Sequence, residues 1–133
     1  MFTINQIREA HSKVKSGADF PYYVQDLILL GVNKYETFVS EGRTNYHGKN
    51  GYEIQSDAKY STLAISQHSK KEQFIQDLKA HQEGKTDYPA FCRDCAKSGI
   101  VKWAVDLSAR TCTYYDSKGT KIIVESIPEP KIK

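Results

Sequence analysis

Apolar and polar residues follow two periodic patterns along the chain, a helical spacing and then a strict alternation, and this pair of patterns occurs twice. Helical spacing of the apolar residues marks two segments, 4–14 and 20–30, and then two more, 70–81 and 88–98. Each pair is followed by a stretch in which apolar and polar residues alternate, which is typical of strands with one buried face. The pattern predicts that each half of the chain forms two helices followed by three antiparallel strands.

Signals for helix ends support these boundaries. Thr3 with Gln6, and Ser69 with Glu72, have the spacing of a capping box and should open the first helix of each half. The second helices carry matching signals, which are caps at Asp19 and Asp87, first-turn prolines at Pro21 and Pro89, and final glycines at Gly31 and Gly99.

The strand pattern is clearest after the last helix, where Trp103 and Val105 alternate with polar or small residues. Second strands are expected at 43–47 and 111–115, and glycine-containing turns then lead to a third strand in each half. Phe38 and Ile123 fall at the alternate positions of their strands, those that should point away from the core, so we expect them on the outer faces of the sheet.

The two halves also share sequence. Residues 19–54 align without a gap on residues 87–122, with nine identities in 36 pairs. This alignment implies an internally duplicated two-layer α+β domain with pseudo-twofold symmetry, each half being two helices and a three-stranded antiparallel meander. We therefore expect a single domain over 1–133, built of repeats 1–66 and 67–127 that are joined through 57–68, with a mobile C-terminal tail over 128–133.

Composition narrows the class of protein. The net charge is only +3, and lysine and arginine are scattered among acidic residues, so we expect no nucleic-acid partner. No apolar run is long enough for a membrane helix, and the first residues do not read as a secretion signal. The three cysteines cannot all pair within the chain, which favours free thiols and a cytoplasmic location.

Cys92 and Cys95 form a CxxC pair, which raises the question of redox or zinc chemistry. Redox CxxC motifs place the first thiol at a helix N-terminus, whereas this helix should begin near Asp87, more than a turn earlier. The aligned residues of the first half are Val24 and Leu27, both expected in the core. We expect buried, reduced cysteines without a metal or other cofactor, and keep thiol or zinc chemistry as the alternative.

Zinc would need four ligands, and Cys112 and His81 could complete the set on paper. However, a CxxC pair inside a helix does not resemble a zinc knuckle, and Cys112 aligns with a threonine. His11 falls on an apolar helix face, which is more typical of a core histidine. No phosphate-binding loop, nucleophile elbow or metalloprotease motif occurs in the sequence.

Arg43, Asn45 and His47 form the most distinctive polar group, because they alternate along one strand and share a face. Threonine and tyrosine occupy the aligned positions of the second half, so the halves differ here. Arginine and histidine would suit an anionic or carbonyl-bearing guest. The alternative is an ordinary solvated strand face.

Four stretches together resemble the YbcV-like family, namely HSKVKSGADFP, LGVNKYETFVSEGRTNYHGKNGYEI, HQEGKTDYPAFCRDCAKSGIVKW and TCTYYDSKG. The resemblance covers essentially the whole chain. It implies a small bacterial, prophage-borne protein of unknown function, some relatives of which are labelled phage envelope protein. It implies no catalytic residues.

These observations favour a cytoplasmic binding module over an enzyme, acting as a monomer on an unknown small molecule or protein. The site is expected either in the groove between the halves or on the sheet face with Arg43 and His47. A phage structural component is a third reading, which rests on the family label.

Overall fold

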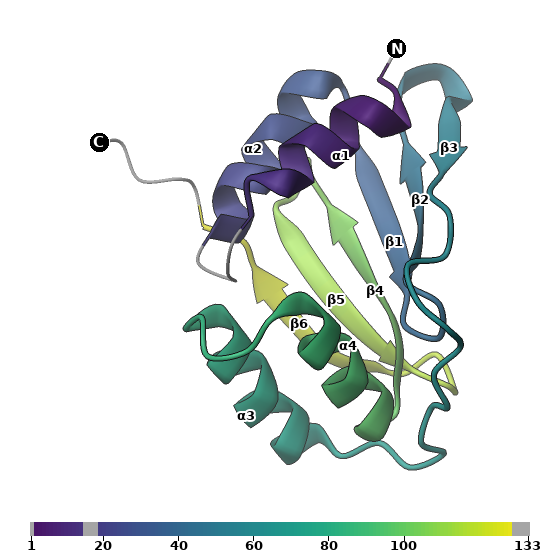
Figure 1. The fold of residues 1–133 in the computed structure, drawn as a ribbon, viewed down its shortest axis with the longest axis vertical. Helices are drawn as coiled ribbons and strands as arrows, with labels where there is room; N and C mark the ends of the chain where they lie inside the picture. The colour runs from purple at the N-terminus through teal and green to yellow at the C-terminus, as the bar shows by residue number, and fades with distance from the viewer. Residues whose placement is uncertain (1, 15–18, 129–133) are drawn as a thin grey trace.

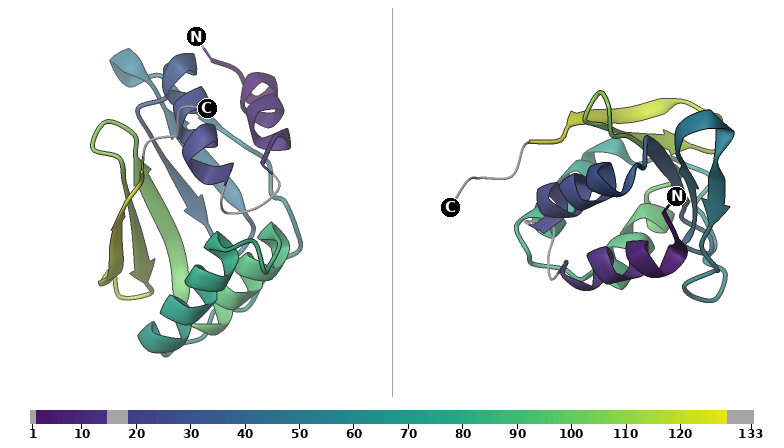
Figure 2. Two further views of the ribbon diagram at one scale, coloured as in Figure 1. Left: turned by 90° about the vertical axis from the view of Figure 1, so that its left-hand side faces the viewer. Right: turned by 90° about the horizontal axis from the view of Figure 1, so that it is seen from above.

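A computed structural model describes residues 2–14 and 19–128. In this part of the chain, four α-helices lie on one face of a six-stranded antiparallel sheet, and a short 3-10 helix, Lys49–Gly51, connects β2 to β3 (Figures 1 and 2). The elements in chain order are α1 (Ile4–Ser12), α2 (Phe20–Leu30), β1 (Lys34–Phe38), β2 (Arg43–His47), β3 (Glu53–Gln55), α3 (Lys71–Gln82), α4 (Tyr88–Lys97), β4 (Ile100–Asp106), β5 (Thr111–Asp116) and β6 (Lys121–Ser126).

The strand order is β3-β2-β1-β4-β5-β6, so β1 and β4 lie side by side at the centre of the sheet. Glu36 of β1 is paired with Ala104 of β4, and the register runs outward from there in both directions. The prediction of an α+β fold, with two helices and then three strands in each half, is confirmed. Residues 129–133, most of the tail for which mobility was expected, lie outside the described residues.

Two of the predicted helix caps form. The Thr3 hydroxyl accepts a hydrogen bond from the Gln6 backbone N–H at 3.2 Å, and the Gln6 side chain accepts one from the Thr3 N–H at 2.9 Å. This completes the capping box of α1. Asp87 caps α4 by accepting a hydrogen bond from the Ala90 N–H at 2.9 Å.

The other two cap predictions are wrong. The helix α3 starts one residue later than Ser69 would place it, and its N-cap, Lys70, makes no side-chain capping bond. The Lys70 N–H instead donates to the Ser98 carbonyl at 3.0 Å, which ties the entry of α3 to the end of α4. Asp19 has helical backbone angles, φ −86° and ψ −6°, rather than the extended ones of a capping residue, and it forms no side-chain capping bond.

The core lies between the helices and the inner face of the sheet. Tyr35, Thr37, Trp103 and Val105 are all buried there, as the alternation predicts. The prediction that Ile123 faces outward is wrong, because Ile123 pairs with the buried Tyr114 and packs against the core. A register shift in the β5–β6 ladder just after this pair changes the phase of the strand.

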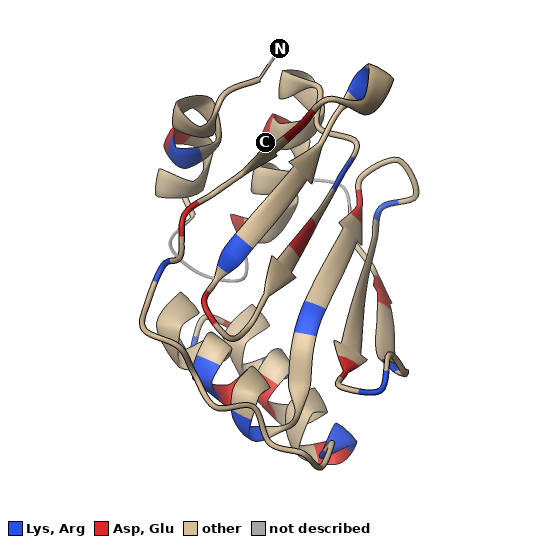
Figure 3. Cartoon of the chain, turned by 90° about the vertical axis from the view of Figure 1, so that its right-hand side faces the viewer, with Lys and Arg blue, Asp and Glu red and all other residues tan. Residues whose placement is uncertain are grey.

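Charged residues are distributed over the whole ribbon. Figure 3 shows lysine and arginine interspersed with aspartate and glutamate on both the strands and the helices. None of the helices in the described ranges is long and apolar enough to span a membrane.

Candidate functional site: an aromatic cleft between two helix pairs

The helices pack in two separate pairs, and this separation positions the candidate site. The helix α1 packs on α2, and α3 packs on α4. Figure 1 shows one pair above the other with the sheet visible between them. A cleft of about 1120 Å³ lies in this region, lined by all four α-helices and by β1, β2, β4, β5 and β6. The two halves of the chain therefore enclose it together.

One side of the cleft is built from rings of the second half. The ring centroid of Trp103 lies 5.6 Å from that of Phe91, 6.1 Å from that of Tyr114 and 6.3 Å from that of Tyr88. All four residues line the cleft. Tyr88 and Phe91 are three residues apart on α4, so both rings project from one helix face onto the indole of Trp103.

The other side carries hydroxyl groups of the first half. Thr37 and Thr44, directly opposite each other on β1 and β2, join their hydroxyls at 2.9 Å. Tyr46 lies two residues from Thr44 on the same inner face of β2, and Tyr23 of α2 also lines the cleft. We call Tyr23, Tyr46, Thr44 and Thr37 the hydroxyl floor. All four line the cleft and are buried.

Two histidines stand at the cleft, one from each half. His11 of α1 lies edge-on to Tyr23, with ring centroids 5.2 Å apart. His81 of α3 stacks on Phe91 at 4.4 Å, and its Nδ1 lies 3.1 Å from the Thr86 carbonyl oxygen. A protonated Nδ1 would donate to this carbonyl, whereas an unprotonated Nδ1 would accept from the Thr86 hydroxyl, whose oxygen lies 3.3 Å away. Partial burial lowers the pKa of both histidines, and Lys59 lowers that of His11 further.

The lowered pKa of His81 predicts a loss of stability in mild acid. The folded-state pKa lies below 6.5, so the unfolded chain binds more protons near that pH. The free energy of unfolding should therefore fall as the pH drops from about 7 to 5, and His81→Gln should flatten this dependence. Urea titrations at several pH values test this, and an equal slope in the variant would contradict it. His11 is more exposed, so His11→Gln should have the smaller effect.

Charged side chains lie at the rim of the cleft. Arg8 and Lys59 are exposed on one side, and Asp87 is exposed on the other. Glu125, which is partly buried, accepts hydrogen bonds from the Gln82 amide at 3.1 and 3.3 Å. Among the described residues that line the cleft, the interior is thus built from rings, hydroxyls, a thiol and aliphatic groups.

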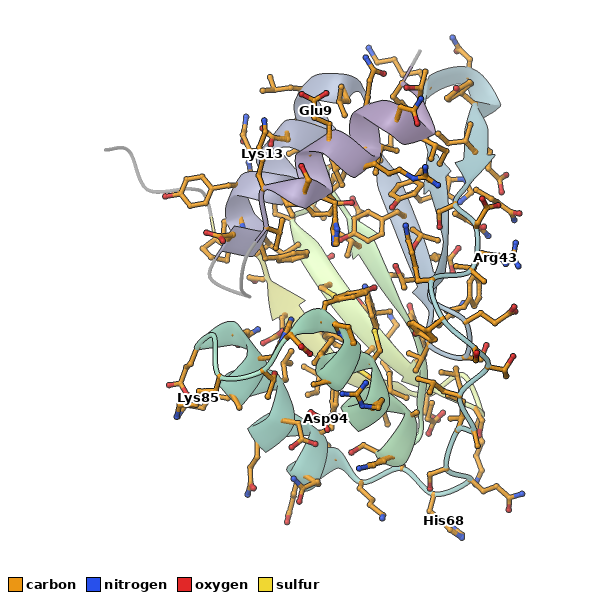
Figure 4. The ribbon with its side chains drawn as sticks, viewed as in Figure 1. Glu9, Lys13, Arg43, His68, Lys85 and Asp94 are labelled. Atoms are coloured by element: carbon orange, nitrogen blue, oxygen red, sulfur yellow. The ribbon has the colours of Figure 1, made fainter. Side chains whose placement is uncertain are left out.

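The residues singled out from the sequence lie on the opposite face of the sheet. Arg43, Asn45 and His47 share the outer face of β2, because Thr44 and Tyr46 between them point inward. Arg43 is 40% exposed and lies 3.6 Å from Glu41, and Figure 4 shows it at the edge of the molecule. His47 Nδ1 lies 3.9 Å from a carboxylate oxygen of Glu53. None of the three lines the aromatic cleft.

All three cysteines are free and buried. Burial raises the pKa of Cys92, raises that of Cys95 well above its usual range, and raises that of Cys112 to about 12. Thiols in this state are poor nucleophiles and poor metal ligands. No group of three or more histidine, cysteine, aspartate or glutamate side chains is placed to hold a metal ion within residues 2–14 and 19–128.

The buried thiols should therefore be inert in the folded protein. We expect Ellman's reagent to label the cysteines only after unfolding, and rapid labelling of the native protein would contradict their burial. Cys92→Val with Cys95→Leu, the residues aligned in the first half, should lower the free energy of unfolding by less than about 1.5 kcal/mol. A larger loss in urea denaturation would show that the thiols have a role beyond packing.

Sequence reasoning missed most of the cleft. The available signal was the set of nine tyrosines, several at inward strand positions. A tyrosine also suits a pleated surface, so the count alone does not separate a site from a sheet. The convergence of two helix pairs on one set of rings becomes apparent only in three dimensions.

The chain belongs to a family described as "Protein of unknown function (DUF1398)", whose sequence profile matches residues 8–126. The match spans the four α-helices and six strands almost completely, so most of the residues that line the cleft fall within the matched range. A comparison with curated proteins finds no match.

Proposed function

We propose that this protein is a non-catalytic binding module that takes up a small, largely apolar molecule in the aromatic cleft. One observation carries the proposal: both halves of the chain line a cleft of about 1120 Å³ with aromatic rings. Ligand sites are typically concave, mainly apolar, and provided with a few polar groups that fix orientation. The cleft has this character, with the hydroxyl floor supplying the polar groups.

A fragment screen by thermal shift tests this proposal, with Trp103 as the reporter. Trp103 is the sole tryptophan of the chain and lines the cleft, so a bound non-fluorescent fragment should change its emission. We expect the hits to raise Tm and to alter this emission. Fragments that raise Tm without any change in tryptophan emission would place the site elsewhere.

The outer face of β2 is the second candidate site. Asn45 Oδ1 and His47 Nε2 are both buried without a hydrogen-bond partner among the described residues. Unsatisfied buried polar atoms call for a partner, and Arg43 beside them would suit an anionic or carbonyl group. Repeating the screen on Arg43→Ala with His47→Ala separates the two sites, because hits that are lost in this variant bind the outer face.

Other expectations from the sequence remain proposals. We propose that the protein acts as a cytoplasmic monomer, that its partner is a small molecule or protein rather than nucleic acid or membrane, and that it is prophage-borne, as the YbcV-like resemblance implies. The free thiols support a reducing compartment. Sedimentation equilibrium tests whether the protein is monomeric. The alternative of a phage structural component predicts that the protein co-purifies with virions, and the thiol alternative predicts reactive native cysteines.

We further propose that the chain is one domain made from a duplicated unit, with repeats 1–66 and 67–127. The central register supports this, because the paired residues Glu36 and Ala104 are also aligned residues of the two halves. A symmetric pairing about that point is what a fused twofold dimer would have. The mild effect expected for Cys92→Val with Cys95→Leu tests the equivalence of aligned positions.

A further inference from the structure

We propose, building on the function proposed above, that the cleft binds an uncharged planar aromatic compound with a hydroxyl or carbonyl group. Its ring would lie on the side of Trp103, and its polar group would meet the hydroxyl floor. The inference rests on the different side chains that the two halves place in the cleft that they share.

The halves place different chemistry at aligned positions. The first half has a hydroxyl at three positions where the second half has none, the aligned pairs being Tyr23 and Phe91, Thr37 and Val105, and Thr44 and Cys112, whereas Phe20 and Tyr88 show the reverse. Thr37 is paired directly with Trp103 across the centre of the sheet, so the polar and aromatic sides adjoin there. A ligand that spans the centre would therefore touch rings at one end and hydroxyls at the other.

The hydroxyl floor has hydrogen-bonding capacity to spare. A hydroxyl offers one donor and two acceptor sites. Among the described residues, the floor hydroxyls form one hydrogen bond with each other, between Thr37 and Thr44 at 2.9 Å, which leaves further donors and acceptors in the row. Tyr35, which also lines the cleft, makes ring contacts with Tyr23 and Tyr46, and no described residue hydrogen-bonds its hydroxyl. The hydroxyl floor can therefore hydrogen-bond to either a hydroxyl or a carbonyl group of a ligand.

The interior favours an uncharged guest. Arg8, Lys59 and Asp87 lie exposed at the rim, Glu125 is engaged by Gln82, and burial lowers the pKa of both histidines at the cleft, which favours their neutral form. An ionised group beside the hydroxyl floor would lose its hydration without gaining a counter-charge, which is costly. A neutral polar group needs only the hydrogen bonds that the floor provides.

The rings favour a planar guest. Trp103 forms tilted contacts with Phe91 and Tyr114, and an edge contact with Tyr88. Aromatic pairs in such offset or edge arrangements gain more than their buried area alone supplies. A flat ring can enter this arrangement, whereas a bulky saturated group would displace the rings.

Three probes with one ring system test the proposal by equilibrium dialysis. They are 2-naphthol, with a neutral hydroxyl, 2-methylnaphthalene, with a methyl group in its place, and 2-naphthoate, with a charge. We expect 2-naphthol to bind about tenfold tighter than 2-methylnaphthalene, as one net hydrogen bond would give, and tighter than 2-naphthoate.

The matched variant carries Tyr23→Phe, Thr37→Val and Thr44→Cys, the residues that the second half already uses. Its preference for 2-naphthol over 2-methylnaphthalene should fall to about threefold or less, with the affinity for 2-methylnaphthalene unchanged. The single variant Thr37→Val replaces it if circular dichroism shows that the triple variant is unfolded, with the same direction of change. Val124→Ala, on the opposite face, should leave all three affinities unchanged.

The outcomes separate this inference from the proposed function. Equal binding of 2-naphthol and 2-methylnaphthalene, or tightest binding of 2-naphthoate, would overturn the inference and leave a cleft that binds aromatic molecules. An unchanged preference in the triple variant would also overturn it, because the selectivity would then come from elsewhere. Failure of all three probes to bind would overturn both.

Discussion

Trp103→Ala is expected to lower the free energy of unfolding by about 3–5 kcal/mol, a large part of what a domain of this size has. Trp103 is only 6% exposed, and its indole packs on Phe91, Tyr88 and Tyr114. Its removal takes one partner from each of these three ring contacts at once. Urea denaturation followed by far-ultraviolet circular dichroism measures the loss, since the variant has no tryptophan to observe.

Trp103→Phe is the control for this prediction, because it keeps an aromatic ring and should cost clearly less. The native protein should also show blue-shifted tryptophan emission that iodide quenches poorly. A loss below about 1 kcal/mol for Trp103→Ala, together with red-shifted and readily quenched emission, would contradict the burial of Trp103 in the core.

Gly99→Ala should have the second large effect, at about 3 kcal/mol or more. Gly99 has φ of +79°, and a Cβ there would lie 2.7 Å from the His68 carbonyl oxygen and 3.0 Å from the Ser69 Cα. Both are backbone atoms of the segment that leads into α3, so they cannot rotate away as a flexible side chain could. The substitution therefore strains the backbone and pushes the entry of α3 away from the end of α4.

Gly31→Ala is the matched control, because Gly31 ends α2 as Gly99 follows α4. Gly31 has φ of +99°, but a Cβ there would meet nothing within 4 Å. Only the left-handed backbone is penalised, so the cost should be about 1–2 kcal/mol. Urea denaturation of both variants gives the difference, and equal losses would contradict the close contact between Gly99 and the segment before α3.

The number and order of the helices and strands could be predicted from the sequence, because each element carries a local signal. Alternation placed Trp103 and Val105 on the buried face, and Thr3 with Gln6 did cap α1. The failed predictions depended on longer-range geometry. The start of α3 is held by the hydrogen bond from the Lys70 N–H to the Ser98 carbonyl, which no local pattern encodes. A register shift in the β5–β6 ladder turns Ile123 inward.

The candidate site was less predictable than the fold, because its parts are distant in the sequence. The sequence pointed to a groove between the halves without naming its lining, and it pointed to Arg43, Asn45 and His47 as a polar strand face. The structure places those three together on the outer face. The hydroxyl floor and the rings around Trp103 come together only through the pairing of β1 with β4 and the spacing of the helix pairs.

The central claim is that small aromatic molecules bind on the helical face of the sheet, and methyl resonances test it most directly. In a titration with 2-naphthol, methyl groups that line the cleft should shift, namely those of Ile7, Thr37, Thr44 and Leu78. Methyl groups on the opposite face, those of Ala104, Thr113 and Val124, should stay in place; Val124 is 57% exposed and pairs with Thr113 there. Shifts confined to this second set, or no shifts at all, would contradict the claim.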